Sequence, residues 1–239
     1  MTRETLPASW YRGDGAYDAE RASVFGRTWQ LVARASELAR AGDYVASTIA
    51  GWPIVVVAGE DASLRAFHDV CLHRGGPLVR DAKGNCGASL VCGYHGWTYA
   101  LDGSLVRARD FGEEMAGRGL ALHPIRVEAW RGLVFVNLDG DAPPLVDALG
   151  GFAEACRDLP LEDFAFDGEQ VHEIQCNWKT YADNYLEGYH IPVVHPELDE
   201  VIDSRRYEVA VHDDGRWCRH TAPARGDGEL DATSGVWLW

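Results

Sequence analysis

Long apolar runs and basic tracts are both missing from this 239-residue sequence. The longest apolar run, residues 54–58, is far shorter than the roughly 20 residues that a membrane-spanning helix needs, and the N-terminus lacks the apolar stretch of a secretory signal. The formal charge is −15 without any Lys- or Arg-rich tract, which would repel a phosphate backbone. We therefore expect a cytoplasmic protein that neither spans a membrane nor binds nucleic acid.

Cysteine is too sparse for a disulfide framework, and the sequence has no internal repeat, low-complexity segment or heptad pattern. Six cysteines over this length do not resemble the dense pattern of a small secreted domain. The absence of repeats argues against solenoids and coiled coils. Apolar residues make up 46% of the chain, which is enough to build the core of one large domain or two ordinary ones.

The pattern of short apolar runs predicts two domains after an N-terminal segment. That segment, residues 1–41, contains one amphipathic helix at about 17–29. In residues 42–138, β-branched and aromatic runs alternate with Gly, Asp and Asn turns, which predicts a small antiparallel β domain with strands within 43–49, 53–58, 64–70, 88–94, 97–105 and 132–138. Residues 139–239 predict a second domain with helices at 145–159 and 177–189 and strands within 171–178, 207–212, 216–222 and 235–239.

Two short segments of the β domain each carry one cysteine and one histidine. Cys71-x-His73 and Cys92-x-x-His95 are eighteen residues apart, and each segment lies at the end of a predicted strand. A zinc finger usually takes both cysteines from one segment and both histidines from another, whereas mixed pairs suit a [2Fe–2S] cluster in which two thiolates bind one iron and two imidazoles the other. The alternatives are a structural zinc site, or buried cysteines and histidines without a metal.

Glycines surround both pairs, in CLHRGG (71–76) and CGYHGWTYALDG (92–103), as needed where backbone amides approach the sulfides. With these motifs the stretch closely resembles the Rieske family. Members from cytochrome complexes carry an extra disulfide-forming cysteine in each loop, where this chain has Gly76 and Tyr94, so the resemblance is to the oxygenase and ferredoxin branch. We expect the other cysteines and histidines to be structural: Cys86, Cys156, Cys176, Cys218, His68, His123, His172, His212 and His220.

A second group of polar residues lies in NWKTYADNYLEGYHIPVVHPEL, residues 177–198. Glu187 and His190 are three residues apart and would share a helix face, so that the carboxylate could orient the imidazole. Five residues of ideal helix would leave His195 roughly 140° from His190, and we expect Pro192 to break the helix so that both rings can face one ion. Two imidazoles with open positions opposite suit non-haem Fe(II), and a solvated helix face is the alternative.

This segment resembles the mononuclear-iron motif of Rieske oxygenase α subunits, which begins with Asn-Trp-Lys as residues 177–179 do here. The resemblance implies that His190 and His195 bind Fe(II). It also implies that Glu187 connects an iron-ligand histidine to a cluster histidine, here His95, of the neighbouring subunit. The preceding polar positions of the motif are matched by Asn184 and Asp183.

The same resemblance implies an α+β fold, in which an antiparallel β Rieske [2Fe–2S] domain is joined to an incomplete helix-grip-like catalytic domain on which the N-terminal segment packs. The family's third iron ligand, an aspartate, lies beyond the point where this sequence stops, within the apolar GVWLW, so we expect a truncated chain. A site completed by water or by Glu197 or Asp199, or a chain without the iron, is the alternative.

The implied function is that of a terminal oxygenase with a [2Fe–2S] cluster and a mononuclear Fe(II), assembled as a homotrimer. Electrons from NAD(P)H would arrive through a reductase or ferredoxin, and O2 would be used to hydroxylate or dihydroxylate a small molecule. Aromatic-ring dioxygenases use Asp at the bridging position, whereas choline and carnitine monooxygenases use Glu, as at Glu187, so aromatic and quaternary-ammonium substrates both stay open. The alternative functions are a Rieske electron carrier and a non-catalytic subunit.

Overall fold

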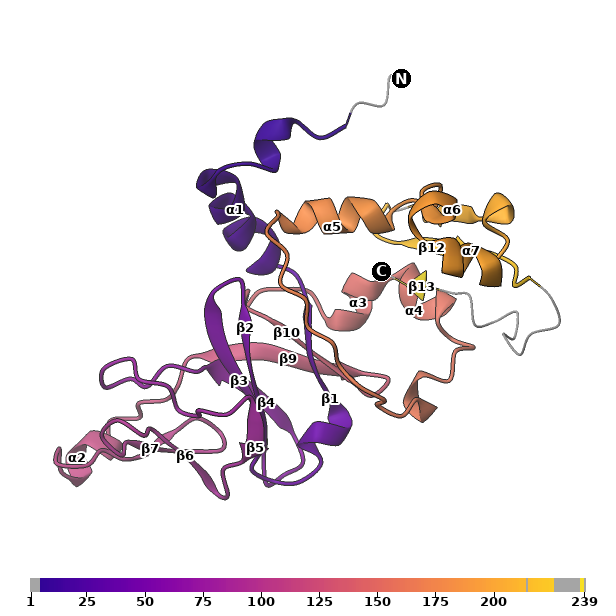
Figure 1. The fold of residues 1–239 in the computed structure, drawn as a ribbon. Helices are drawn as coiled ribbons and strands as arrows, with labels where there is room; N and C mark the ends of the chain where they lie inside the picture. Colours follow the sequence, from indigo (N-terminus) through magenta and orange to yellow (C-terminus); the bar gives the residue numbers. More distant parts are fainter. Residues whose placement is uncertain (1–4, 214, 226–236, 239) are drawn as a thin grey trace. The chain divides into compact units, whose positions relative to one another are not determined.

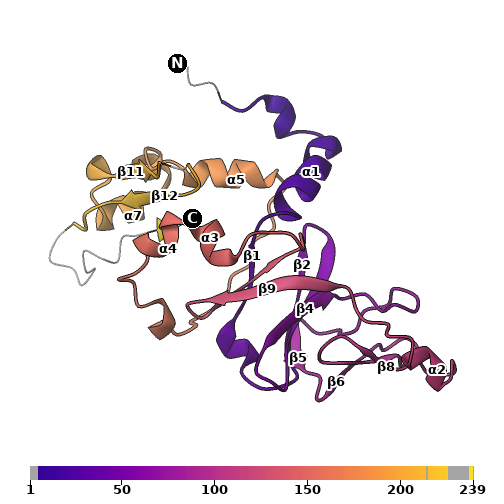
Figure 2. The ribbon, with the colours of Figure 1, turned by 180° about the vertical axis from the view of Figure 1, so that it is seen from behind.

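The computed structural model describes residues 5–213, 215–225, 237 and 238. The chain forms two compact units, residues 18–166 and residues 1–17 together with 167–239, and each is described by itself (Figures 1 and 2). Antiparallel sheets and short helices make up both units, which confirms the α+β class. None of the described helices has the length and apolar character needed to cross a membrane. The domain boundaries at 41/42 and 138/139 stay predictions.

The unit of residues 18–166 is built on a seven-stranded sheet with the order β1-β10-β9-β4-β3-β2-β5, in which every neighbouring pair is antiparallel. A smaller antiparallel sheet has the order β6-β7-β8. The strands are β1 (Gln30–Arg34), β2 (Asp43–Ile49), β3 (Trp52–Ala58), β4 (Leu64–His68), β5 (Lys83–Asn85), β6 (Ser89–Val91), β7 (Thr98–Ala100), β8 (Leu105–Arg107), β9 (Pro124–Trp130) and β10 (Leu133–Asn137).

The apolar run in β3 is explained by burial of this strand on both faces of the large sheet. Successive side chains of a strand point to opposite faces. Val55 and Val57 belong to one buried cluster, which also contains the cysteines of the two Cys–His segments, while Ile54, Val56 and Ala58 belong to the other. All five are at most 3% exposed. Full burial of one such Val or Ile side chain contributes about 1.5–3 kcal/mol, so β3 anchors the strands that lead to the candidate site.

The first two predicted helices differ from the observed ones in their bounds. The helix expected at 17–29 begins at Asp14 and ends at Phe25, as α1 (Asp14–Glu20) followed by the π-helical η2 (Arg21–Phe25). The helix expected at 145–159 is two short helices, α3 (Leu145–Leu149) and α4 (Gly151–Ala155), because Gly150 between them has φ 49° and cannot continue a right-handed helix. The remaining short helices are η1 (Ala8–Trp10), η3 (Ala35–Leu38), α2 (Glu113–Ala116) and η4 (Leu161–Asp163).

The unit that contains residues 167–225 consists of short helices and one antiparallel sheet of order β11-β12-β13. The strand expected within 171–178 is wrong, since residues 171–176 form neither helix nor strand. The helix expected at 177–189 ends at Tyr185, and the strand expected at 235–239 is described only at Trp237–Leu238. The elements are α5 (Trp178–Tyr185), α6 (Ile191–Val194), α7 (Pro196–Val201), η5 (Ser204–Arg206), β11 (Glu208–Val211), β12 (Cys218–Thr221) and β13 (Trp237–Leu238).

Candidate cluster and iron sites

The two Cys–His segments form two loops with the same backbone hydrogen bonds. In the first loop, the amide of Cys71 donates to the carbonyl of Gly76 (2.8 Å), and the amide of Gly75 donates back to the carbonyl of Cys71 (2.9 Å). The second loop repeats both bonds from Cys92, with the same spacing and at 2.9 Å each. Gly75 and the matching Gly96 both have φ 71°, a conformation that favours glycine. Similar local sequence therefore produces two matching loops, which begin just after β4 and directly after β6.

The loops bring the four expected donors together at one end of the unit. Cys71 and Cys92 are each 2% exposed. The rings of His73 and His95 approach edge-on with their centroids 4.5 Å apart. The Nδ1 atom of His73 is buried without a hydrogen-bond partner, although buried ring nitrogens are normally paired. The lone pair of this nitrogen is therefore not used by another protein group and would be available to a metal.

Aromatic side chains surround this group. The ring of His73 stacks on Trp97 with centroids 5.0 Å apart, and Phe111 meets it edge-on at 5.4 Å. Tyr94 lies 3.9 Å from the His95 ring and is 63% exposed. Burial, followed by the nearby charges of His95 and Arg74, lowers the pKa of His73 below its ordinary value. The neutral imidazole is the form that binds a metal.

Tyr99 contacts the sulfur of Cys71 through its hydroxyl group. Its hydroxyl oxygen accepts a hydrogen bond from the Leu72 amide (3.1 Å) and lies 3.2 Å from the Cys71 Sγ atom, so the hydroxyl proton is available to the sulfur. Burial raises the pKa of the Cys71 thiol, while hydrogen bonds from Tyr99 and from the His73 amide oppose the increase. Metal binding requires the thiolate, so loading the site would release this proton.

The donor set fits a [2Fe–2S] cluster better than a single ion. Each iron of a Rieske cluster takes only two side chains, so one pair of cysteines and one pair of histidines supplies all of the protein ligands. Gly76 packs directly beside this set, since a Cβ atom there would lie 3.4 Å from both the Cys92 Sγ atom and Tyr94. These loops define an iron–sulfur protein of the Rieske class.

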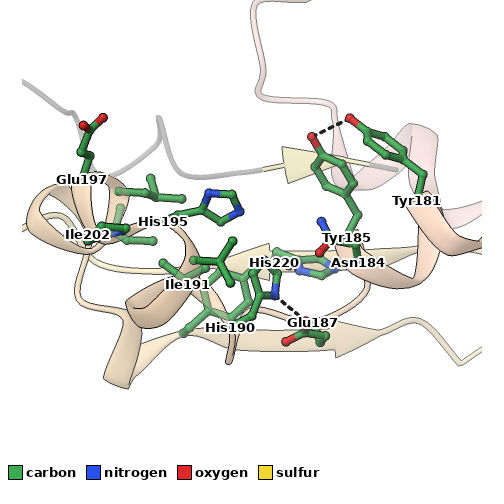
Figure 3. Close-up of a pocket in the computed structure, with 14 residues that line it drawn as sticks. Tyr181, Asn184, Tyr185, Glu187, His190, Ile191, His195, Glu197, Ile202 and His220 are labelled. Atoms are coloured by element: carbon green, nitrogen blue, oxygen red, sulfur yellow. Dashed lines mark hydrogen bonds and ion pairs between the residues drawn. The ribbon is translucent and has the colours of Figure 1, made fainter. Parts of the chain in front are cut away.

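The second group of predicted residues surrounds a pocket of about 750 Å³ in the other unit (Figure 3). His190 and His195 lie at the two ends of α6, and their ring centroids are 5.3 Å apart. The pocket lining also includes Asn184 and Glu187, as predicted, and the full set is Tyr181, Asn184, Tyr185, Glu187, His190, Ile191, Val194, His195, Pro196, Glu197, Leu198, Ile202, Tyr207 and His220.

Pro192 does not cause the break in the helix that was expected at 177–189. The helix α5 ends at Tyr185, and residues 186–190 form an irregular loop. Pro192 lies in the first turn of α6, where a missing amide donor is tolerated. His195 has φ −125° and ψ 62°, so the chain turns again between α6 and α7. The expectation that the two rings come together is met, but the expected cause was wrong.

Glu187 contacts His190 through this loop and not across a helix face, which corrects a second expectation. Its Oε1 atom is hydrogen-bonded to the Nδ1 atom of His190, and its Oε2 atom accepts from the Tyr189 amide at 2.8 Å. With Nδ1 engaged, Nε2 is the nitrogen left for a metal. Asp183 is not part of the pocket lining, because its carboxylate accepts a hydrogen bond from the Tyr11 hydroxyl at 2.5 Å.

Two polar residues from outside the predicted 177–198 segment also line the pocket. His220, expected to be structural, is 1% exposed and lines the pocket, as does Tyr207. One feature of the sequence could have drawn attention to His220, because Cys218-x-His220 has the same spacing as Cys71-x-His73. The Nε2 atom of His220 indeed lies 3.1 Å from the Cys218 Sγ atom.

Comparisons with known proteins agree with this geometry. A family model of the Rieske [2Fe-2S] domain matches residues 28–121, and a model of the ring hydroxylating alpha subunit catalytic domain matches residues 161–237. The carnitine monooxygenase oxygenase subunit of Escherichia coli (strain K12) is 36% identical over 253 residues, which cover 98% of this chain and 65% of that protein. The glycine betaine monooxygenase oxygenase subunit of Chromohalobacter salexigens is 35% identical over 81% of this chain and 44% of its own length.

Solved structures show the same relationship. The quaternary ammonium Rieske monooxygenase CntA matches 93% of this chain and 62% of its own with a TM-score of 0.84 and 34% identity. Naphthalene 1,2-dioxygenase with bound indole matches 88% and 52% with a TM-score of 0.72 and 28% identity. The chain belongs to the family of Rieske oxygenase α subunits, and it spans less than two thirds of the length of these relatives. The family and the two cofactor types inferred from the sequence are confirmed.

Proposed function

We propose that this chain acts as the terminal oxygenase component of a Rieske monooxygenase and hydroxylates a quaternary-ammonium small molecule with O2. The observation that carries the proposal is the pocket in which His190, His195 and Glu187 meet, in a chain that also holds two matching Cys–His loops. Electrons would come from NAD(P)H through a reductase or ferredoxin. The proposed location is the cytoplasm, where NAD(P)H is available to the reductase.

Each site residue has a role in this proposal. Cys71 and Cys92 would hold one iron of the cluster, and His73 and His95 the other. His190 and His195 would hold the mononuclear iron, with Asn184 beside them in the pocket lining. When bound, the cluster supplies single electrons and the mononuclear iron supplies O2 activation.

The chain's own residues prepare these sites. Tyr99 stabilises the thiolate of Cys71, and Trp97 and Phe111 keep water away from His73. Glu187 holds the Nδ1 proton of His190 and so fixes the ring orientation and tautomer.

Electron transfer would cross between subunits of a homotrimer, from His95 through Glu187 of a neighbouring copy to His190. The CntA structure has been described in terms of inter-subunit electron transfer. Tyr94 and the half-buried His95 put one end of this route at the surface of the Rieske loops.

Several observations favour a quaternary-ammonium substrate. Two of the similar proteins are oxygenase subunits of a carnitine and a glycine betaine monooxygenase, and a choline monooxygenase of Arabidopsis thaliana is 31% identical over 87% of this chain. Glu187 and Glu197 line the pocket together with Tyr181, Tyr185 and Tyr207, and no Lys or Arg is among its described lining residues. Carboxylates and tyrosine faces attract a cation that cannot donate hydrogen bonds. The Glu187 side chain is also the acid expected of the choline-like and carnitine-like branch.

A substrate comparison tests this proposal. With an NADH-dependent reductase, we expect at least one of carnitine, glycine betaine and choline to be hydroxylated with a kcat/KM at least about tenfold above that for naphthalene. Product formation by mass spectrometry, together with O2 uptake, provides the measurement. Oxidation of naphthalene without product from any of the three cations would contradict the proposed substrate class.

Iron content separates the oxygenase from a pure electron carrier. The oxygenase requires two cluster irons and one mononuclear iron, so about three irons and two sulfides per chain are expected after anaerobic reconstitution. A chelator should remove about one iron while the cluster absorption persists, because the cluster irons are also held by bridging sulfides. Iron and sulfide analysis before and after chelation gives the answer. Two irons per chain, with no further uptake of Fe2+, would favour the electron carrier.

A further inference from the structure

The loop that carries Glu187 and His190 is held together by its own hydrogen bonds. Both carboxylate oxygens of Glu187 are engaged within the loop, one with the His190 ring and one with the Tyr189 amide. The carboxylate and the imidazole therefore move together when the loop moves. The position of both groups depends on what fixes the loop to the rest of its unit.

Gly188, at the centre of this loop, is buried against the ring of Tyr207. A Cβ atom on Gly188 would lie within 2.6 Å of three carbon atoms of that ring, a distance that real Cβ atoms do not adopt. Only glycine allows the backbone to approach the ring so closely. Tyr207 directly precedes β11, so this contact joins the loop to the sheet.

Tyr207 is in turn fixed by two consecutive buried hydrogen bonds. Its hydroxyl lies 2.7 Å from the Nδ1 atom of His220, and the Nε2 atom of His220 lies 3.1 Å from the Cys218 Sγ atom. His220 is 1% exposed and Cys218 is 6% exposed. The two residues share one face of β12, since they are two positions apart on a strand.

A neutral imidazole completes the hydrogen bonds of Tyr207 and Cys218 in either of its tautomers. If the Tyr207 hydroxyl donates to Nδ1, then Nε2–H donates to the sulfur, and in the other tautomer both directions reverse. In either arrangement, both nitrogens of a ring that lines the pocket are satisfied. A fully satisfied buried network rigidifies its surroundings.

We infer that Tyr207, His220 and Cys218 form a positioning unit that fixes the 186–190 loop and thereby sets the geometry of Glu187 and His190 for the mononuclear metal. The inference rests on the proposed function, because the metal is the group that is positioned. None of the three residues needs to touch the metal. Their effect reaches it through Gly188.

Anaerobic Fe2+ titration of the full chain with its cluster oxidised tests the unit, with EPR of the nitric oxide adduct of the bound Fe2+ as the spectroscopic readout. Tyr207→Phe keeps the ring on Gly188 but removes the hydroxyl, and we expect about tenfold weaker Fe2+ binding and an altered EPR line shape. Tyr189→Phe is the matched control, because this neighbouring tyrosine is 85% exposed, and it should bind Fe2+ like the wild type.

Two variants of Cys218, the residue hydrogen-bonded to the other side of His220, extend the test. Cys218→Ser keeps a hydrogen-bonding group beside His220 and should bind Fe2+ more tightly than Cys218→Ala. If Tyr207 had a merely structural role, Tyr207→Phe would lower the melting temperature without changing the Fe2+ affinity or the EPR signal. That result would overturn the inference but not the assignment of the iron site. Failure of the wild-type chain to bind any Fe2+ beyond its cluster would instead overturn the proposed function, and the inference with it.

Discussion

Replacing His73 by Ala is expected to abolish the EPR signal of the reduced Rieske cluster and to reduce bound iron and sulfide at least about tenfold. His73 and His95 would share one iron, so the loss of His73 leaves that iron with a single protein ligand. The half-buried ring also contacts Trp97 and Phe111, and its removal would take away both contacts beside the cluster. EPR of the dithionite-reduced protein, together with iron and sulfide analysis, measures the effect.

His172→Ala is the matched control, because His172 is exposed and lies outside both candidate sites. It should keep the full signal. A signal that survives in His73→Ala would contradict the ligand assignment. Zinc without sulfide in the wild-type protein would support the structural zinc site that the Cys–His spacing also allows.

The β domain could be predicted from the sequence because its signals are local. The residues predicted for one strand, 43–49, form β2, and the apolar run of β3 reflects burial on both faces. The matching loops follow from glycines at fixed positions after each cysteine. Four strands were missed. The strand β5 has three residues and no large apolar side chain, and β8 has three residues of which only Leu105 lies within a predicted segment. The strands β1 and β9 are held by long-range pairing with β10 and, for β9, also with β4.

The metal-site unit was less predictable because long-range contacts determine it. The composition of residues 171–176 suggests a strand, but these residues have no neighbouring strand to pair with among the described residues. Pro192 was expected to break the helix, yet a proline is acceptable in a first turn, and the chain turns before and after it instead. The role of Tyr207 and His220 depends on a contact with Gly188, and the sequence separation hides it.

Replacing Glu187 by Gln is expected to slow electron transfer from the cluster to the mononuclear iron by about 10- to 100-fold while both cofactors stay bound. The amide oxygen can still accept the Nδ1 proton of His190, so the ring keeps its orientation. The side chain loses its negative charge, and its NH2 group would face the Tyr189 amide, which the carboxylate now satisfies. Stopped-flow reoxidation of the reduced cluster in a single turnover, with substrate and O2, measures the rate.

The control for this variant is Glu197→Gln, which removes another carboxylate from the same pocket lining but no contact to His190. If Glu187 acts through its charge on the route between cluster and iron, Glu187→Asp should recover part of the rate, and Glu197→Gln should leave the rate at saturating substrate unchanged. Equal rates in Glu187→Gln and the wild type, at equal iron content, would remove Glu187 from the route. Equal slowing in both Gln variants would instead assign the effect to the overall negative charge of the pocket, because each change removes one charge and only Glu187 contacts His190.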